Sequence, residues 1–363
     1  MRIALIGPPQ SGKSTLFAAV AEAGGSHIDL SRPDRDHLAV VKVPDVRLDW
    51  LAEKSQATKV TFAELDFIDV PGLDLSSEPA RLQSQAHWPT MRNSDMLVLV
   101  VRSFKSESVP AYRGRISPEG DIEEFLTELL FADLDQVTAR VAKLEAATRK
   151  PTADRQDQLK ELELMKRLAE VIEKGKPISE AVHPGTDQKL LRSFAFLSQK
   201  PLLVVLNCSE DDLATEATTL CSVPCIKLSA KIEEEITQLP PEDRGGFLSD
   251  LGLDSSASER LIRACYERLN LVTFLTYKPN ELRTGMASES RAWTIPAGAD
   301  ALTAAGQIHS DIARGFIRAE TVAFDDLAAA GDMKAARAAG KVRLEGKSYV
   351  VQDGDVINFR FNV

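Results

Sequence analysis

The sequence feature that most constrains the fold is a glycine-rich segment near the start of the chain. Gly7-x-x-x-x-Gly12-Lys13-Ser14 follows the apolar run Arg2–Ile6 and precedes Thr15–Ala23, whose apolar residues have helical spacing. A strand, a glycine-rich turn and a helix in this order form the context in which this pattern binds phosphate. Glycine lets the backbone curl so that N–H groups point at phosphate oxygens, and the helix N-terminus favours an anion. The segment therefore predicts a P-loop.

Each position of this loop has an expected role. Lys13 is expected to reach the β and γ phosphates of a nucleotide, and the Ser14 hydroxyl to ligate Mg²⁺. The other nucleotide-binding residues predicted in the loop are Pro9, Gln10, Ser11, Gly12 and Thr15. The alternative is a chance match in a glycine-rich turn, which the strand and helix on either side disfavour.

Composition places this loop in an ordinary globular chain. The 363 residues are 44% apolar and 27% charged, which excludes bulk disorder. A net charge of −10 argues against a protein that coats nucleic acid through charge alone. We see no apolar run of the roughly 20 residues that a membrane helix needs, no secretory signal, and no disulfide framework in four cysteines. We therefore expect a cytoplasmic protein without membrane contact.

Further apolar runs predict an α/β sheet, mostly parallel, because helical stretches separate several of them. The expected strands are Leu38–Val43, Phe62–Ile68, Met96–Val101, Leu202–Leu206 and Cys225–Leu228.

The Phe62–Ile68 strand leads into Asp69-Val70-Pro71-Gly72. P-loop enzymes need a second acidic residue near the metal, and Asp69 fits that position, acting through a water. The backbone N–H of Gly72 would face a γ-phosphate, so we assign Lys13 and Gly72 as catalytic residues and Ser14 and Asp69 to the metal. A plain Pro-Gly turn is the alternative.

A second strand, Leu202–Leu206, leads into Asn207-Cys208-Ser209-Glu210. GTPases read guanine with Asn-Lys-x-Asp at such a strand end. Asn207 is retained, but Glu210 is one methylene longer than the Asp that accepts two hydrogen bonds from guanine. We therefore expect a weaker guanine preference, with adenine admitted. Ser229 and Ala230 follow the next strand, where GTPases place a backbone N–H at the base.

Two regions depart from the strand–helix alternation. Leu126, Leu130, Leu134 and Val137 begin a helical apolar pattern that resumes at Leu162 after a polar stretch, which predicts an antiparallel helical hairpin. Two ordinary surface helices are the alternative. Beyond Pro279, short strands are expected at 293–296, 321–324, 348–351 and 356–361, forming a small mixed β domain.

Together these residues resemble the YchF / Obg-like ATPase family of Obg-related P-loop proteins. The resemblance covers nearly the whole chain and includes VPDVRLDWLA at 43–52, the stretches at 67–73 and 207–210, and the C-terminal stretches 291–294, 305–320 and 340–363. It implies a P-loop G domain (1–118 and 199–278), an inserted helical hairpin domain (119–198) and a ubiquitin-like β-grasp TGS domain (279–363). It also implies ATP or GTP hydrolysis with Mg²⁺, association with the ribosome or a ribosomal subunit, and RNA contact through the TGS domain. We expect a monomer.

Several positions depart from the family pattern. The Thr of the first switch falls at Pro33, with Ser31 as the nearby substitute, and 74–93 contains no glycine. A candidate catalytic His falls at Ala111; His87 is the other His nearby and is interpreted as structural. Family members have an apolar residue in place of the catalytic Gln, and Leu73 fits. K⁺ is a further candidate ion, although Gln10 stands where K⁺-using relatives have Asn.

The remaining motifs favour structural roles. Cys221-x-x-x-Cys225 lacks the spacing of a metal site. Cys208 lies beside the base motif, so a redox-sensitive site is the alternative to a core residue. His309 is interpreted as structural, with contact to RNA or protein as the alternative.

Two hypotheses about function follow. In the favoured one the chain is a slow ATPase, with GTP as a less selective alternative substrate, that acts with the ribosome in translation or stress regulation. In the other it is a nucleotide-sensing ribosome or RNA adaptor with little or no hydrolysis, because the switch residues are altered.

Overall fold

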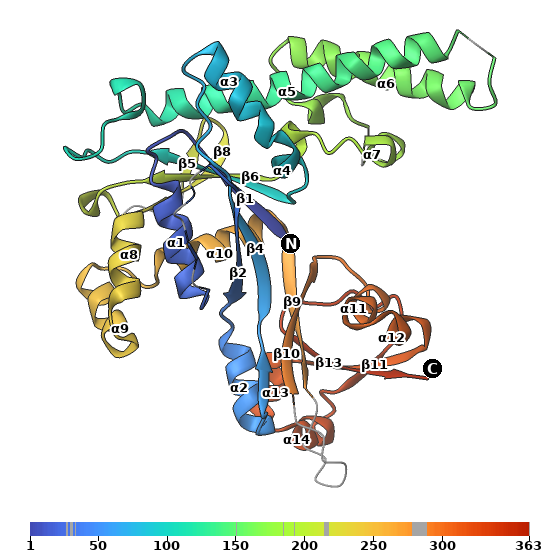
Figure 1. The fold of residues 1–363 in the computed structure, drawn as a ribbon. Coiled ribbons are helices and arrows are strands. Elements are labelled where there is room, and N and C mark those ends of the chain that lie inside the picture. The colour runs from blue at the N-terminus through green and yellow to red at the C-terminus, as the bar shows by residue number, and fades with distance from the viewer. Residues whose placement is uncertain are drawn as a thin grey trace. The chain divides into compact units, whose positions relative to one another are not determined.

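The chain folds into two compact units in a computed structural model (Figure 1). The first unit contains Met1–Ala39 and Asp66–Ser258, and the second contains Val40–Leu65 and Glu259–Val363. The structure describes residues 1–26, 28–29, 32, 34–149, 151–183, 185–191, 193–213, 218–277 and 289–362. Pro33 and Ser31, the predicted first-switch positions, lie outside these ranges.

A seven-stranded sheet carries the nucleotide motifs, and its strands confirm the predicted α/β fold. Strands β1, β4, β5, β6 and β8 pair in parallel, and β7 pairs antiparallel with β8. The sheet order is β2 (His37–Val43), β4 (Ala63–Asp69), β1 (Arg2–Ile6), β5 (Met96–Arg102), β6 (Leu202–Asn207), β8 (Val223–Leu228) and β7 (Thr218–Leu220).

The carboxyl ends of these parallel strands bring distant residues to one edge of the sheet. Asp69 lies opposite Leu5, two residues before the glycine-rich loop. Asn207 lies opposite Arg102 on β5 and Leu228 on β8. Ligands of open α/β sheets bind at this edge, so the fold itself gathers the predicted phosphate, metal and base residues.

Helices surround this sheet, and their ends follow from local sequence. Helix α1 (Lys13–Ala23) begins after Gly12 and ends at Gly24, while Ser77 caps α3 by accepting a hydrogen bond from the Ala80 N–H. The others are α3 (Glu78–Ser84), α4 (Trp88–Arg92), α7 (Thr186–Leu191), α8 (Ala230–Gln238) and α9 (Pro241–Asp250), with 3₁₀ turns η1 (Gln85–His87), η2 (Tyr112–Gly114), η3 (Ile178–Ala181), η4 (Leu197–Gln199) and η5 (Glu210–Asp212).

Two long helices form the expected hairpin. Helix α5 (Pro118–Ala147) and helix α6 (Arg155–Glu173) run side by side (Figure 1). Their contact is apolar, with Val137 and Leu144 of α5 buried in one cluster with Leu168 of α6.

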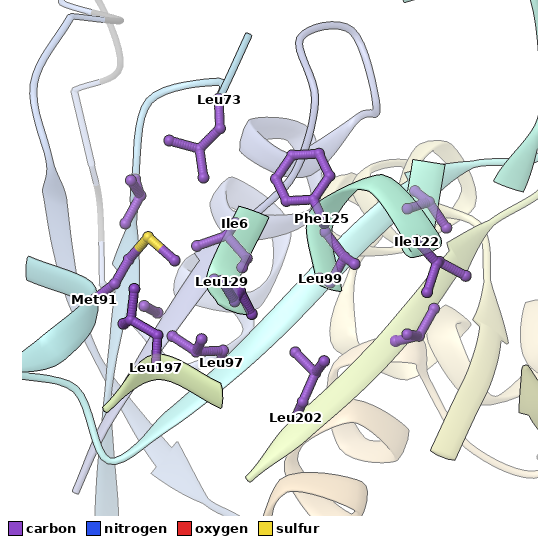
Figure 2. Packing of buried hydrophobic residues seen from close by; sticks show 14 of the residues in the cluster. Ile6, Leu73, Met91, Leu97, Leu99, Ile122, Phe125, Leu129, Leu197 and Leu202 are labelled. Carbon is purple, nitrogen blue, oxygen red and sulfur yellow. The ribbon is translucent and has the colours of Figure 1, made fainter. Parts of the chain in front are cut away.

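The first half of α5 packs elsewhere. Ile122, Phe125 and Leu129 are buried with Ile6 and Leu99 of the sheet (Figure 2). The predicted insertion begins at 119, but these residues belong to the core of the nucleotide-binding sheet. One continuous helix therefore joins that core to the hairpin.

A six-stranded mixed sheet forms the second unit. The order is β12 (Arg343–Glu345), β11 (Phe316–Ala323), β13 (Asp355–Phe361), β9 (Leu271–Tyr277), β10 (Glu289–Pro296) and β3 (Lys59–Thr61). The helices in this part of the chain are α2 (Val46–Ser55), α10 (Ala257–Arg268), α11 (Ala301–Ile308), α12 (Ser310–Arg314), α13 (Phe324–Ala330) and α14 (Met333–Ala338).

Three details of the C-terminal prediction need correction. The expected strand 348–351 contributes only an isolated bridge between Val350 and Asp300. Phe324, expected at a strand end, begins α13. Strand β9 pairs with β10 and β13, so this sheet starts before the predicted boundary at residue 279. The wider division into three domains stays a prediction.

Among the described helices, none has the length and apolar character required to cross a membrane.

Candidate nucleotide site

The glycine-rich loop joins β1 to α1, and two of its positions exclude a side chain. A Cβ on Gly7 would come within 2.3 Å of the Val100 carbonyl oxygen. Gly12 has φ 84° and ψ 13°, a left-handed conformation that favours glycine, and a Cβ there would lie 2.0 Å from Nδ2 of Asn207. At these two positions the loop therefore approaches β5 and the end of β6 so closely that only glycine fits.

The curl of the loop is suited to an anion. Gln10 also has a positive φ of 62°, and Gly12 offers no side chain to cap the first N–H groups of α1. Free N–H groups at the start of a helix, together with the helix dipole, favour an anion there, as in phosphate-binding turns. Ser11 is buried, whereas Gln10 and Ser14 are exposed and Pro9 and Thr15 are partly buried.

Lys13, Ser14 and Asp69 meet at the start of α1. The Lys13 ammonium donates to Oδ1 of Asp69, and both side chains are only 5% exposed. The Ser14 hydroxyl donates to Oδ2 of the same carboxylate at 2.8 Å. The predicted phosphate lysine and the two predicted metal residues therefore form one cluster, although they come from two strand ends.

This cluster fits Mg²⁺ held together with a nucleotide. Magnesium is usually bound by one or two protein oxygens plus substrate phosphates and waters. Ser14 and Asp69 supply a hydroxyl and a carboxylate, both hard oxygen ligands. Across the described ranges, no group of three His, Cys, Asp or Glu residues could hold a metal alone.

Gly72 and Leu73 follow the metal-side strand and lie against the loop. A Cβ on Gly72 would lie 3.2 Å from the Pro9 Cα, and the Leu73 N–H donates to the Gly7 carbonyl at 3.0 Å. The Leu73 side chain is fully buried beside Ile6 and Met91 (Figure 2). Leu73, which the resemblance places where GTPases carry a catalytic Gln, therefore turns away from solvent into the core.

Asn207 connects the phosphate loop to the loop after β8. Its Nδ2 donates to the Ser11 carbonyl at 2.9 Å, and its Oδ1 accepts from the Ala230 N–H at 3.0 Å. Ser229 caps α8 through the Ile232 N–H. Glu210 is exposed at the start of η5, three residues beyond Asn207. The four predicted base-side residues thus lie at the ends of the adjoining strands β6 and β8, and Asn207 links the two ends through its hydrogen bond with Ala230.

The structure adds two residues that the sequence did not single out. Arg102, at the end of β5, is 5% exposed and donates to the carbonyls of Phe104, Val109 and Pro110 at 3.0–3.1 Å. Its guanidinium stacks on Phe104, 4.3 Å from the ring centroid. Phe104 in turn lies 3.8 Å from the Cβ position of Gly12. The one available signal was an arginine closing an otherwise apolar strand.

Among the described residues, the positions that depart from the family pattern include Ala111 and the stretch 74–93, and His87 lies within that stretch. His87 lies 3.4 Å from Asp36, which also accepts a 2.6 Å hydrogen bond from Thr90, consistent with a structural histidine. Ala111 precedes the turn η2. The glycine-free stretch 74–93 forms α3, η1 and α4.

Two other candidate residues have structural contacts. Cys208 is buried, with its Sγ 3.4 Å from the Leu228 carbonyl, and His309 caps α12.

Two family models match this chain, one near each end. Residues 2–139 match the family model described as "50S ribosome-binding GTPase". Residues 271–362 match the YchF-type GTPase C-terminal model, described as "Protein of unknown function (DUF933)".

Curated relatives extend this similarity over the full length. The chain is 37% identical to "Ribosome-binding ATPase YchF" of Bacillus subtilis over 371 residues, covering 99% of this chain and 98% of that protein. It is 33% identical to the protein of the same name from Escherichia coli O157:H7, with the same coverage, and 30% identical to "Obg-like ATPase 1" of Oryza sativa, covering 100% and 92%.

A solved structure supports the fold. The Schizosaccharomyces pombe YchF GTPase superposes with a TM-score of 0.83 at 26% identity, covering 99% of this chain and 97% of that one.

Proposed function

Because this chain belongs to the YchF family of P-loop proteins, we propose that it binds ATP with Mg²⁺, and GTP less selectively, and hydrolyses the nucleotide slowly in association with the ribosome. The observation that carries the proposal is the cluster of Lys13 and Ser14 on one buried carboxylate, Asp69, at the mouth of the glycine-rich loop. Such a cluster joins a phosphate-binding cation to a metal-binding pair.

Binding assigns a role to each residue of the loop. The N–H groups from Pro9 to Thr15 surround the phosphates, except that proline has no N–H and contributes shape alone. In the nucleotide complex Lys13 would contact the β and γ phosphates in place of Asp69, and Ser14 and Asp69 would hold Mg²⁺, which would neutralise phosphate charge. Asp69 would then keep a cationic partner, because the divalent cation would replace the lysine.

Base recognition favours ATP in this proposal. Both side-chain ends of Asn207 are engaged with the protein, on Ser11 and Ala230, so Glu210 is left as the carboxylate for the base. A glutamate in place of aspartate moves that carboxylate outward by one methylene, which disturbs the bidentate geometry that guanine needs. Phe104 offers a flat apolar face that either purine accepts.

Hydrolysis is slow in this proposal because no side chain at position 73 can orient water. Phosphoryl transfer depends mainly on positioning and charge stabilisation. Lys13 supplies charge, and the Gly72 N–H faces the γ-phosphate. The buried Leu73 offers neither a donor nor an acceptor.

The ribosome is the proposed partner because the Bacillus and Escherichia relatives are named ribosome-binding ATPases. We further propose a cytoplasmic monomer with a role in translation or stress regulation. In this proposal the three predicted domains have separate roles, and the TGS domain contacts RNA. K⁺ remains a candidate ion, although Gln10 in place of Asn weakens that assignment.

A nucleotide-sensing adaptor with little hydrolysis is the second candidate, favoured by Ala111 at the expected histidine position. The two candidates differ in turnover. We would measure ATP hydrolysis by the full chain with Mg²⁺, with and without K⁺ and ribosomes, against Lys13→Ala. The matched control is Lys231→Ala, since Lys231 is 83% exposed.

Turnover above the Lys13→Ala background that persists in Lys231→Ala would support the enzyme. Ribosome binding that survives Lys13→Ala, without turnover in the unmutated protein, would instead favour the adaptor. Absence of ribosome association would remove the ribosomal part of both.

A further inference from the structure

We propose that Tyr112 and Arg113 are positioning residues that hold the segment Asp74–Ser76 and connect it to helix α5. Nucleotide bound at Gly72 would thereby shift the first turns of α5. This inference rests on the proposed function, because nucleotide binding is its input. The segment Asp74–Ser76, held by Tyr112 and Arg113, is called the clasp below.

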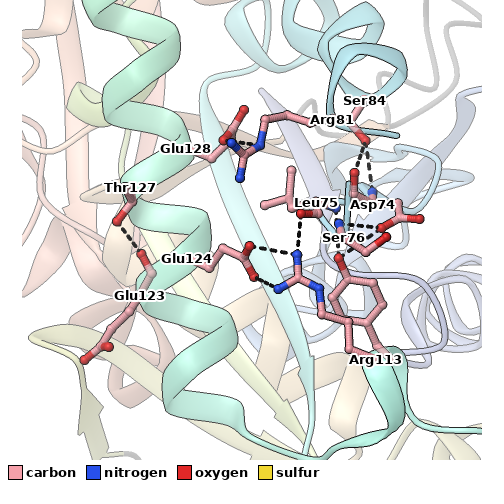
Figure 3. Close-up of polar contacts among 11 residues, drawn as sticks. Asp74, Leu75, Ser76, Arg81, Ser84, Arg113, Glu123, Glu124, Thr127 and Glu128 are labelled. Atoms are coloured by element: carbon pink, nitrogen blue, oxygen red, sulfur yellow. Dashed lines mark hydrogen bonds and ion pairs between the residues drawn. The ribbon is translucent and has the colours of Figure 1, made fainter. Parts of the chain in front are cut away.

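The clasp is fixed by the Tyr112 hydroxyl. This oxygen accepts a 2.8 Å hydrogen bond from the Leu75 N–H and donates to Oδ1 of Asp74 at 3.1 Å. Asp74 also accepts from the Ser76 N–H at 2.8 Å, and its backbone N–H donates to Ser84 at 2.9 Å. The backbone and the side chain of Asp74 are thus both held (Figure 3).

Arg113 carries the connection from the clasp to α5. One guanidinium nitrogen, Nη2, donates both to the Leu75 carbonyl and to Oε1 of Glu124, while Nη1 donates to Oε2. The two Glu124 distances are 2.8 and 2.9 Å, the two-point geometry of strong charged hydrogen bonds (Figure 3). Arg113 has φ 53°, a conformation that non-glycine residues rarely adopt, so surrounding contacts must hold it.

The two residues before the clasp contact the phosphate loop. Gly72 packs on Pro9, and the Leu73 N–H donates to the Gly7 carbonyl. Only Leu73 separates Gly72 from the clasp. A γ-phosphate that draws the Gly72 N–H toward itself would therefore displace Asp74. The hydrogen bonds from the clasp to Tyr112 and Arg113 must then either break or move Arg113 and Glu124 with the clasp.

Helix α5 is placed to respond over a long distance. Its first half contacts α3 through the ion pair of Arg81 with the buried Glu128, 3.2 Å apart. Its 30 residues span about 45 Å and continue into the hairpin with α6. A shift of its first turns would thus reach a surface far from the nucleotide.

Amide hydrogen exchange of the full chain tests this coupling. The comparison is Mg²⁺ alone against Mg²⁺ with a non-hydrolysable ATP analogue, in the unmutated protein, Tyr112→Phe and Glu124→Ala. Arg115→Gln is the matched control, because Arg115 also pairs with α5, 3.4 Å from Asp121, but has no contact with the clasp among the described residues.

We expect the analogue to change exchange by about fivefold or more in 73–78 and in 118–128 of the unmutated protein and of Arg115→Gln. In Tyr112→Phe and Glu124→Ala, binding and the change in the phosphate loop should persist, while the change in 118–128 is lost. ATP turnover, where measurable, should fall in kcat with little change in KM. Thermal unfolding identifies a variant that fails to fold, and the other variant then decides.

Two results would overturn the coupling while leaving nucleotide binding intact. In one, the unmutated protein binds the analogue without any change of amide exchange in 118–128. In the other, Tyr112→Phe and Glu124→Ala keep the full change of exchange there. An unmutated protein that does not bind the analogue overturns the proposed function itself, and the coupling with it.

Discussion

Asn207 lies directly against Gly12: its Nδ2 occupies the place where a Cβ on Gly12 would be, 2.0 Å away. Asn207 therefore closes the phosphate loop from the base side, and the glycine is required for two reasons, the left-handed backbone and the absence of space.

Gly12→Ala should consequently abolish nucleotide binding and destabilise the protein. The left-handed conformation alone costs about 1–2 kcal/mol, and displacement of Asn207 adds to this. Gly25→Ala is the matched control, since Gly25 has a similar φ of 81° with open space around it. Thermal unfolding and nucleotide titration of both variants check this; equal losses would contradict the packing argument.

Leu73→Gln should not restore GTPase-like catalysis. Leu73 is fully buried, so a glutamine there must bury its amide, and we expect a destabilisation of about 2–4 kcal/mol with no gain in turnover. Leu82→Gln on α3, where Leu82 is 60% exposed, should be nearly neutral. Faster hydrolysis in a stably folded Leu73→Gln variant would show that this side chain can reach the site.

Phe104→Leu should weaken nucleotide binding, because it removes the aromatic face but keeps an apolar side chain; the stacking of Arg102 on the ring is lost as well, so thermal unfolding of the variant is measured alongside. Stacking of a base on an aromatic ring contributes about 1–3 kcal/mol. Titration with ATP and with inorganic triphosphate separates base from phosphate contributions: only the ATP affinity should fall. Equal losses for both ligands would contradict base stacking.

Glu128 on α5 should make stability depend on pH. Burial raises the pKa of this carboxyl, although the charge of Arg81 opposes the shift. The folded protein then holds the proton more tightly than the unfolded chain, whose value is near 4.5. The stability contributed by the protonated carboxyl is therefore lost as pH rises from the unfolded pKa, near 4.5, through the higher folded pKa.

Glu128→Gln should remove that loss. Its thermal midpoint should exceed that of the unmutated protein at pH 7, and the difference should shrink as pH falls below about 4.5. Glu123→Gln, exposed on the same helix, should change little. A lower midpoint for Glu128→Gln at pH 7 would mean that the ion pair with Arg81 outweighs burial.

The parts of the fold that sequence could predict are those with local causes. The strand, loop and helix around Gly7–Ser14 are contiguous, and the residues themselves encode the turn. The hairpin followed from regular apolar spacing. Asp69 and Asn207 were predicted because both end apolar strands, and the parallel sheet then brought them to one edge.

What could not be predicted depends on distant partners. Asn207 contacts Ser11 across 196 residues of sequence, and Arg102 holds its loop through carbonyls that no pattern marks. The stretch 348–351 has strand-like residues but forms only one bridge. Leu271–Tyr277 reads as the end of the nucleotide domain until its partners, β10 and β13, are known.

The most direct test of the central claim is calorimetry of the unmutated protein with non-hydrolysable ATP and GTP analogues in the presence of Mg²⁺, repeated for Glu210→Asp. The account predicts that ATP binds as tightly as GTP or more tightly, and that Glu210→Asp shifts the preference toward GTP. A clear preference of the unmutated protein for GTP would contradict it.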